Sequence, residues 1–314
     1  MSGRDPVEEI VNAVLYEGYI LYPYRPSAVK NRVRWTFGGI HPRGYSEEHG
    51  TTEPWRMQTE CLLVAGPGCR LSAEIRFLHL LERIEEGREP WQEATERRFP
   101  CADVEIADLR QEAVRMAIRL PSERAEDAAV VHRWRSVEAE VVVSAVPVVG
   151  GADRVSVEIV NTTTVAAGLD REQAMLHSLV SAHTILRVTG GRLLSQTDPP
   201  PEFREAAAGC HNVGTWPVLV GEAGASDTVL SSPIILEDHP RIAEESPGAL
   251  FDSTEIDEIL TLRILSLTEA EKAEMRATDE RARQLLERTE SLTGDDLMRM
   301  HGTIRSLRQA QGER

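Results

Sequence analysis

Several features that would assign this chain to a familiar class are missing from its 314 residues. No stretch approaches the roughly 18 apolar residues of a membrane-spanning helix. The first ten residues, MSGRDPVEEI, lack the apolar core of a signal peptide. Lysine occurs only at Lys30 and Lys272, so arginine supplies nearly all of the basic charge. Because both kinds of apolar stretch are missing, we expect a cytoplasmic protein with no transmembrane segment.

The cysteines do not form a recognisable metal or redox motif. There are four of them, Cys61, Cys69, Cys101 and Cys210, and none belongs to a CxxC pair. This excludes a zinc ribbon and a thioredoxin-like site. Buried, reduced structural cysteines are the favoured interpretation. A coordinating pair made by Cys61 and Cys69 is the alternative.

Catalytic signatures and a basic surface are also lacking. The sequence contains no GxxxxGK[ST], GxGxxG, HExxH or GxSxG, which removes the usual nucleotide-binding, zincin and serine-hydrolase interpretations. The net charge of −16 argues against broad nucleic-acid binding, because the phosphate backbone would be repelled.

What is present indicates a globular protein with a β-rich first half. The apolar share of 41% and the charged share of 27% are typical of soluble domains. Residues 12–40 read as extended, 42–54 as a polar loop, and 82–98 as a charged loop or short helix. A hairpin is predicted from Arg56–Ala65 and Cys69–Leu81 around the turn Pro67-Gly68. Further strands are predicted within 130–149 and at 154–160. Such strands favour an antiparallel sandwich or barrel.

Helix signals dominate the second half. Asp170 and Gln173 form a capping box, and an apolar stripe follows it as far as Gly190-Gly191. Short strands are predicted at 216–220 and 229–236. Helices are predicted from Asp252 or Ser253, from Thr268 to about Thr289, and at 295–307. We therefore expect an α+β protein with three parts: a mainly β domain (1–168), a helix plus a loop-rich and strand region packing on it (169–250), and a charged helical C-terminal extension (251–314).

Two segments of opposite charge stand out from this background. Residues 17–43 contain five basic side chains and one acid, whereas residues 237–258 contain eight acids and one base. Arginine and tyrosine are enriched at interface hot spots, and arginine also suits phosphate or carboxylate ligands. The first segment therefore predicts a partner- or anion-binding group; the alternative is pairing with the acidic segment of the same chain. The predicted group consists of Tyr22, Tyr24, Arg25, Lys30, Arg34 and Trp35.

The acidic segment supplies the best metal candidates, Asp238, His239 and Glu245. Carboxylates and one imidazole suit a divalent ion, although a solvated acidic loop is the favoured interpretation. Cys210 beside His211 would need a histidine from elsewhere to act as a nucleophile, because neighbours in an extended segment face opposite ways. His177 and His183, six residues apart on the predicted helix, would point about 120° away from each other, which disfavours a shared metal site.

Long phrases in both segments resemble one bacterial protein family. They are YILYPYRPSAVKNR (19–32), SSPIILEDHPRIAEESPG (231–248) and LFDSTEIDEILTLR (250–263), followed by the charged stretch at 267–289. The family is associated with gene clusters of high-affinity, actinobacterial-type nickel–iron hydrogenases. The resemblance covers about a third of the chain and carries over no catalytic residue. It implies an accessory role in assembling or maturing a hydrogenase, with a hydrogenase subunit or maturation protein as partner.

Three functional hypotheses follow. The first is a non-enzymatic assembly protein that acts by protein binding, has no bound cofactor and could form a homo-oligomer. The second is a metal-dependent enzyme or metal-delivery protein that uses Asp238, His239 and Glu245. The third is a structural subunit of a larger complex, which would bury on the order of 2,000 Å² or more in its interface.

Overall fold

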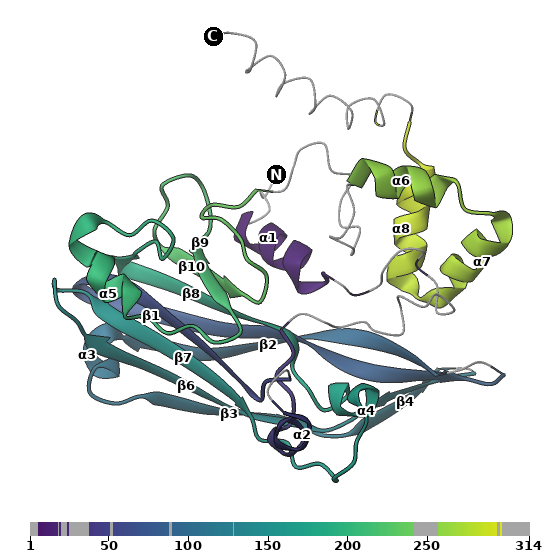
Figure 1. Ribbon diagram of the computed structural model, residues 1–314, viewed down its shortest axis with the longest axis horizontal. Coiled ribbons are helices and arrows are strands. Elements are labelled where there is room, and N and C mark those ends of the chain that lie inside the picture. The colour runs from purple at the N-terminus through teal and green to yellow at the C-terminus, as the bar shows by residue number, and fades with distance from the viewer. Residues whose placement is uncertain are drawn as a thin grey trace, which may run out of the picture. The chain divides into compact units, whose positions relative to one another are not determined.

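A computed structural model describes residues 6–17, 19, 24, 38–50, 53–87, 90–127, 129–241, 257–293 and 296 (Figure 1). The chain divides into two compact units. Unit 1 comprises Met1–Leu15 and Phe37–Pro240, and unit 2 comprises Tyr16–Thr36 and Arg241–Arg314. No helix among the described residues is both long enough and apolar enough to cross a membrane.

Unit 1 is built on one ten-stranded sheet in which every strand pair is antiparallel. The main order is β3-β6-β7-β1-β8-β10-β9; in addition, β2 and β5 pair with β1, and β4 pairs with β5. The strands are β1 (Arg56–Glu85), β2 (Trp91–Glu105), β3 (Val114–Leu120), β4 (Glu123–Asp127), β5 (Val130–Trp134), β6 (Val137–Pro147), β7 (Asp153–Asn161), β8 (Val180–Leu193), β9 (Trp216–Leu219) and β10 (Thr228–Ser232).

Short helices surround this sheet, and unit 2 is helical. Those of unit 1 are α1 (Pro6–Leu15), α2 (Arg43–His49), α3 (Ile106–Leu109), α4 (Arg171–Met175), the 3₁₀ turn η2 (Pro201–Phe203) and α5 (Arg204–Ala208). Those of unit 2 are α6 (Asp257–Leu265), α7 (Glu269–Thr278) and α8 (Glu280–Glu290). The α+β class, the mainly antiparallel sheet and the helical C-terminal part are confirmed.

The predicted hairpin around Pro67-Gly68 is wrong, because β1 runs without interruption through this point. Ala65 pairs with Gly191 and Arg70 with Thr189, so four residues of β1 lie opposite the single Gly190. Pro67 and Gly68 are therefore the tip of a bulge inside a 30-residue strand. Glycine is needed at residue 66, where a Cβ would lie 2.6 Å from the carbonyl oxygen of Gly190.

The bulge divides β1 into two parts with different partners. Residues 56–63 pair with β7, whereas residues 70–83 pair with β2. Each part of β1, with the strands that follow from its partner, forms one branch of the sheet. One apolar cluster contains buried side chains from both branches: Phe77 and Cys101 come from the branch with β2, and Val141 and Val157 come from the branch with β7. Both branches of the sheet therefore share a single core, although the sheet does not close into a barrel.

A second, smaller apolar cluster lies under α1. Val7, Ile10 and Val11 of this helix pack with buried residues of β8, β9 and β10. The apolar spacing of i, i+3 and i+4 is that of an amphipathic helix. The prediction of extended structure from residue 12 is therefore wrong for residues 12–15.

Other helix and loop predictions also need correction. The helix predicted from Asp170 to Gly190 stops at Met175, and β8 occupies the rest, so β8, β9 and β10 extend the sheet itself. Within the predicted loop or helix at 82–98, residues 82–85 belong to β1 and residues 91–98 to β2, where cross-strand ion pairs such as Arg83–Glu93 accommodate the charges. α2 lies within the predicted loop at 42–54.

In unit 2, the helix predicted from Thr268 to Thr289 is two helices. The capping box at Thr268 and Glu271 is present. The chain breaks at Asp279, whose extended backbone ends α7 and whose side chain accepts a hydrogen bond from Ala282 N in the first turn of α8. The helix predicted at 295–307 lies outside the described residues, apart from Asp296.

Candidate functional site

Of the six residues predicted to bind a partner or an anion, the structure describes only Tyr24. Its side chain is fully buried, and its backbone φ of 56° is left-handed. Tyr24 therefore supports the interior of unit 2 and offers no exposed ring. Tyr22, Arg25, Lys30, Arg34 and Trp35 lie outside the described residues.

Tyr16 and Tyr19, around the start of this basic segment, pack with the helices of unit 2. Tyr19 donates its hydroxyl to Asp279 Oδ2 at 2.9 Å. The guanidinium of Arg281 lies 3.9 Å from the ring centroid of Tyr16, a cation–π geometry. The N-terminal aromatic residues and the C-terminal helices, far apart in sequence, therefore form one packed body.

Among the described residues of unit 2, large exposed apolar side chains lie on α6. Ile259 and Leu262 are 41% and 46% exposed, whereas Leu260 and Ile264 of the same helix are buried. Residues three apart lie on one helix face. α6 therefore has one apolar face that packs inward and a second that the described part of the chain leaves in solvent.

Asp238 and His239, the metal candidates, are engaged at the edge of the sheet. Asp238 Oδ2 accepts hydrogen bonds from Ser195 Oγ at 2.5 Å and Thr197 Oγ1 at 2.8 Å, and its Oδ1 accepts one from Leu219 N at 2.8 Å. His239 N donates to Leu219 O at 2.7 Å. This segment covers the outer edge of β9 and so protects it from pairing with other chains.

The third metal candidate, Glu245, lies outside the described residues. Among the residues that are described, no three or more histidine, cysteine, aspartate or glutamate side chains are grouped as a metal site would require. Asp238 therefore has an observed structural role, with both carboxylate oxygens already bonded.

The Cys210-His211-Asn212 segment is docked against the start of β1. Glu60 Oε2 accepts a hydrogen bond from His211 N at 2.7 Å, and Asn212 Oδ1 accepts one from Glu60 N at 2.7 Å. Burial, with the nearby Glu60 carboxylate, raises the pKa of Cys210 to about 11. Its thiol is therefore protonated at neutral pH, which is the opposite of what a nucleophile needs.

His177 and His183 do not share a helix, so the predicted angle between them does not apply. His177 follows α4, and His183 lies on β8. The Nδ1 of His183 is 2.6 Å from Ser181 O, and its Nε2 is 3.2 Å from Ser232 Oγ. Burial lowers its pKa to about 4. A neutral imidazole that donates from Nδ1 and accepts at Nε2 satisfies both contacts.

A serine–histidine–glutamate chain, which the sequence motifs did not indicate, lies between α2 and α4. Ser178 Oγ is 3.2 Å from His41 Nδ1, and the Nε2 of the same imidazole contacts the carboxylate of Glu53. Burial lowers the pKa of His41 to about 4. However, Ser178 and His41 are both buried, and Ser178 Oγ also lies 2.8 Å from Ala174 O. These three side chains therefore hold the segments flanking α2 against the turn after α4, and they do not present a nucleophile.

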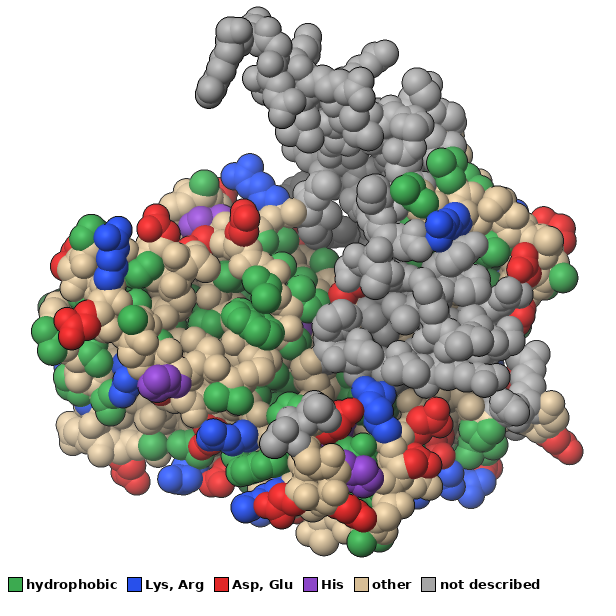
Figure 2. All heavy atoms as spheres, viewed as in Figure 1, with side chains coloured by type: hydrophobic (Ala, Val, Ile, Leu, Met, Phe, Trp, Pro, Cys, Tyr) green, Lys and Arg blue, Asp and Glu red, His purple; other side chains and the backbone are tan. Residues whose placement is uncertain are grey.

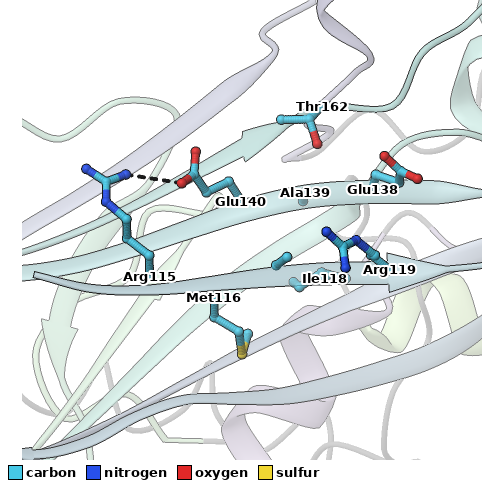
Figure 3. A pocket seen from close by; sticks show the side chains of 9 residues that line it. Arg115, Met116, Ile118, Arg119, Glu138, Ala139, Glu140 and Thr162 are labelled. Atoms are coloured by element: carbon cyan, nitrogen blue, oxygen red, sulfur yellow. Dashed lines mark hydrogen bonds and ion pairs between the residues drawn. The ribbon is translucent and has the colours of Figure 1, made fainter.

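A shallow cavity of about 320 Å³ lies on β3, the last strand at one end of the sheet (Figure 3). Arg115 and Glu140 form an exposed ion pair across it at 3.1 Å. On the face seen in Figure 2, acidic and basic side chains of the described residues are similarly interspersed. Exposed ion pairs of this kind contribute under about 1 kcal/mol to stability. We therefore interpret the cavity as a charged depression on the surface of the strands, without a strong internal interaction. Its lining residues are Arg115, Met116, Ala117, Ile118, Arg119, Glu138, Ala139, Glu140 and Thr162.

Comparison with known proteins gives no match, either to a protein-family model or to a curated protein.

Proposed function

We propose that this protein is a non-enzymatic accessory protein that acts by binding another protein through the exposed face of α6. The observation that carries the proposal is the pair Ile259 and Leu262, which leaves two large aliphatic side chains in solvent on one helix face. Apolar anchors at i and i+3 are the usual means by which a helix docks into an apolar groove of a partner.

The packing around α6 supports its use as a rigid platform. Leu260 and Ile264 are buried, which fixes the orientation of the opposite face. Glu290 on α8 pairs with Lys272 at 3.2 Å and with Arg276 at 2.8 Å on α7, which ties these two helices together. A preorganised helix face loses little conformational freedom on binding, which favours affinity.

Three described side chains that could have done chemistry have observed structural contacts instead. Cys210 is held protonated by burial, Asp238 accepts three hydrogen bonds, and Ser178 is buried beside His41. These contacts favour a binding role over the alternative in which Asp238 and His239 hold a metal ion.

The partner we propose is a subunit or maturation protein of a nickel–iron hydrogenase. The support for this identity is the resemblance of residues 250–263, which include both Ile259 and Leu262. The resemblance and the exposed apolar face therefore coincide on the same helix.

Affinity purification of the tagged full-length protein from its native cells, followed by mass spectrometry and metal analysis, tests this function. Stoichiometric recovery of a hydrogenase subunit or maturation protein is the expected result. Recovery of the chain alone, carrying a full equivalent of a transition metal, would replace the proposal with a metal-dependent role.

A further inference from the structure

Three arginines of the sheet converge on one carboxylate of α1. Glu8 Oε2 accepts hydrogen bonds from Arg76 Nη1 at 3.0 Å and Arg98 Nη1 at 3.1 Å. Its other oxygen, Oε1, lies 3.9 Å from Arg187 Nη2. The guanidiniums come from β1, β2 and β8, whereas the carboxylate comes from a helix that lies far away in sequence. This arrangement is a carboxylate-binding site that the chain fills with its own side chain.

The arginines of this site are carried by the sheet and do not depend on α1 for their position. Arg76 is fully buried and donates to Glu96 Oε1 at 2.5 Å, and Arg98 Nε donates to the same oxygen at 2.6 Å. Glu96 lies on β2, so this pairing persists if α1 leaves. Without Glu8, the guanidiniums of Arg76 and Arg98 would share the single carboxylate of Glu96, and their excess positive charge would attract another acid.

Apolar residues beside the arginines complete a groove for a helix. Val7, Ile10 and Val11 of α1 pack on Ile185 of β8, Val218 of β9 and Leu230 of β10, with Val220 beside them. Asn12, one turn after Glu8, accepts a hydrogen bond from Arg76 Nη2 at 2.8 Å. The groove therefore recognises a pattern: an acid, an amide four residues later, and apolar side chains on the same face.

Two properties of α1 make it displaceable. It has 10 residues, and isolated helices shorter than about 12–15 residues are marginal in water, so its helicity depends on docking. It also packs in a cluster separate from the main core of the sheet. Release of α1 would leave that main core intact.

We propose that the groove beneath α1 binds an acidic amphipathic helix of a partner protein, and that α1 occupies the groove until that helix displaces it. The partner's carboxylate takes the place of Glu8 among Arg76, Arg98 and Arg187. This inference rests on the proposed function only in taking the partner to be a protein.

A peptide competition on the full-length chain tests the groove. The probe is a fluorescein-labelled peptide with the sequence of residues 5–16, DPVEEIVNAVLY, and binding is followed by fluorescence anisotropy. In the chain, Glu8→Arg places a fourth cation among the arginines and so weakens the docking of its own α1. We expect this variant to bind the peptide at least tenfold more tightly than the wild-type chain.

Glu9→Arg is the matched control, because Glu9 is exposed on the same helix turn and the charge change is identical. It should bind the peptide as the wild type does, and a peptide carrying Glu8→Arg should not bind to any of the three chains. The proposal is overturned if the Glu8→Arg chain binds no more tightly than the Glu9→Arg chain, or if both peptides bind equally.

Hydrogen exchange provides a second test that needs no variant of the chain. When excess unlabelled peptide is added to an isotope-labelled wild-type chain, the amides of α1 should exchange at least tenfold faster, while those of β1 keep their protection. Unchanged α1 exchange at saturating peptide would overturn the inference.

The outcomes separate this inference from the proposed function. If native purification recovers a partner through α6 but the peptide fails both tests, the groove inference falls and the function stands. If the peptide binds as expected but no partner is ever recovered, the groove stands as a helix-binding site and the function falls.

Discussion

Arg110 donates two parallel hydrogen bonds to the fully buried carboxylate of Asp153, from Nε to Oδ1 at 2.6 Å and from Nη2 to Oδ2 at 2.7 Å. Arg110 follows α3, and Asp153 begins β7, so the pair joins the turn after β2 to the other branch of the sheet. The hydrogen bonds to Asp153 raise the pKa of Arg110. The pair therefore holds the two branches together beside the core.

We predict that Arg110→Ala lowers the free energy of unfolding by on the order of 3 kcal/mol, because it leaves a buried carboxylate unpaired. Urea denaturation measures the change. Arg115→Ala, which breaks the exposed pair with Glu140, is the control and should lower it by less than about 1 kcal/mol. Equal effects of the two variants would show that burial of Asp153 does not matter.

The bulge in β1 gives a second prediction. Gly66→Ala places a Cβ 2.6 Å from the carbonyl oxygen of Gly190, and the backbone must shift to relieve the contact. We expect a loss of about 1–3 kcal/mol in urea denaturation. Gly44→Ala, on α2 with open space around it, should instead be neutral or stabilise by up to about 1 kcal/mol. A neutral Gly66→Ala variant would contradict the close approach of β1 and β8.

Buried neutral histidines predict a loss of stability in mild acid. Burial lowers the pKa of His79 and of His183 from 6.5 to about 4. Between these values the unfolded chain binds a proton that the folded chain excludes, so stability is fully present above pH 6.5 and falls as the pH drops towards 4. Each group contributes about 1.4 kcal/mol per pH unit in this window.

Denaturation midpoints measured between pH 5.5 and 7 check the histidine prediction. His79→Gln keeps a donor for the carbonyl of Arg135, which lies 2.8 Å from His79 Nε2, but it cannot titrate. The variant should therefore reduce the pH dependence of unfolding by about one proton. If the unfolding free energy of the variant depended on pH as steeply as that of the wild type, His79 would have to bind a proton in the folded chain as readily as in the unfolded one.

Thiol reactivity tests the structural interpretation of Cys210. Because burial raises its pKa to about 11, alkylation by iodoacetamide at pH 8 should be on the order of 100-fold slower than for a free thiol. Mass spectrometry of the native and the urea-unfolded chain measures both rates. Fast labelling of Cys210 in the folded protein would revive the nucleophile hypothesis.

The features that could be predicted from sequence were those with a local physical cause. The capping boxes at Asp170 with Gln173 and at Thr268 with Glu271 depend on side chains three residues apart, and both are present. The strand at 154–160 was recognised because one face is buried and the other is partly exposed, which gives a clean alternation.

The errors arose where tertiary contacts override the local pattern. β8 is buried on both faces over Val180–Leu186, so its apolar residues fit a helical period as well as a strand. Pro67-Gly68 has the composition of a hairpin turn, but here it forms a bulge that only the pairing with β8 reveals.

The three-arginine site was missed for a similar reason. Arg76 falls on the polar side of an alternating strand, which reads as a solvated face, yet α1 covers it. The amphipathic spacing of Val7, Ile10, Val11 and Val14 was the available signal, and it points to a helix that must bury one face.

The most direct test of the central claim is native affinity purification of the Ile259→Ser/Leu262→Ser double variant beside the wild-type chain. The control is Val146→Ser/Val149→Ser, which removes two exposed aliphatic side chains, 44% and 89% accessible, from the end of β6 and the turn that follows it. We predict that the α6 variant stays folded but loses at least nine-tenths of the hydrogenase partner, because the apolar anchors are gone, while the control retains it. Equal recovery of that partner by all three chains would contradict binding through α6.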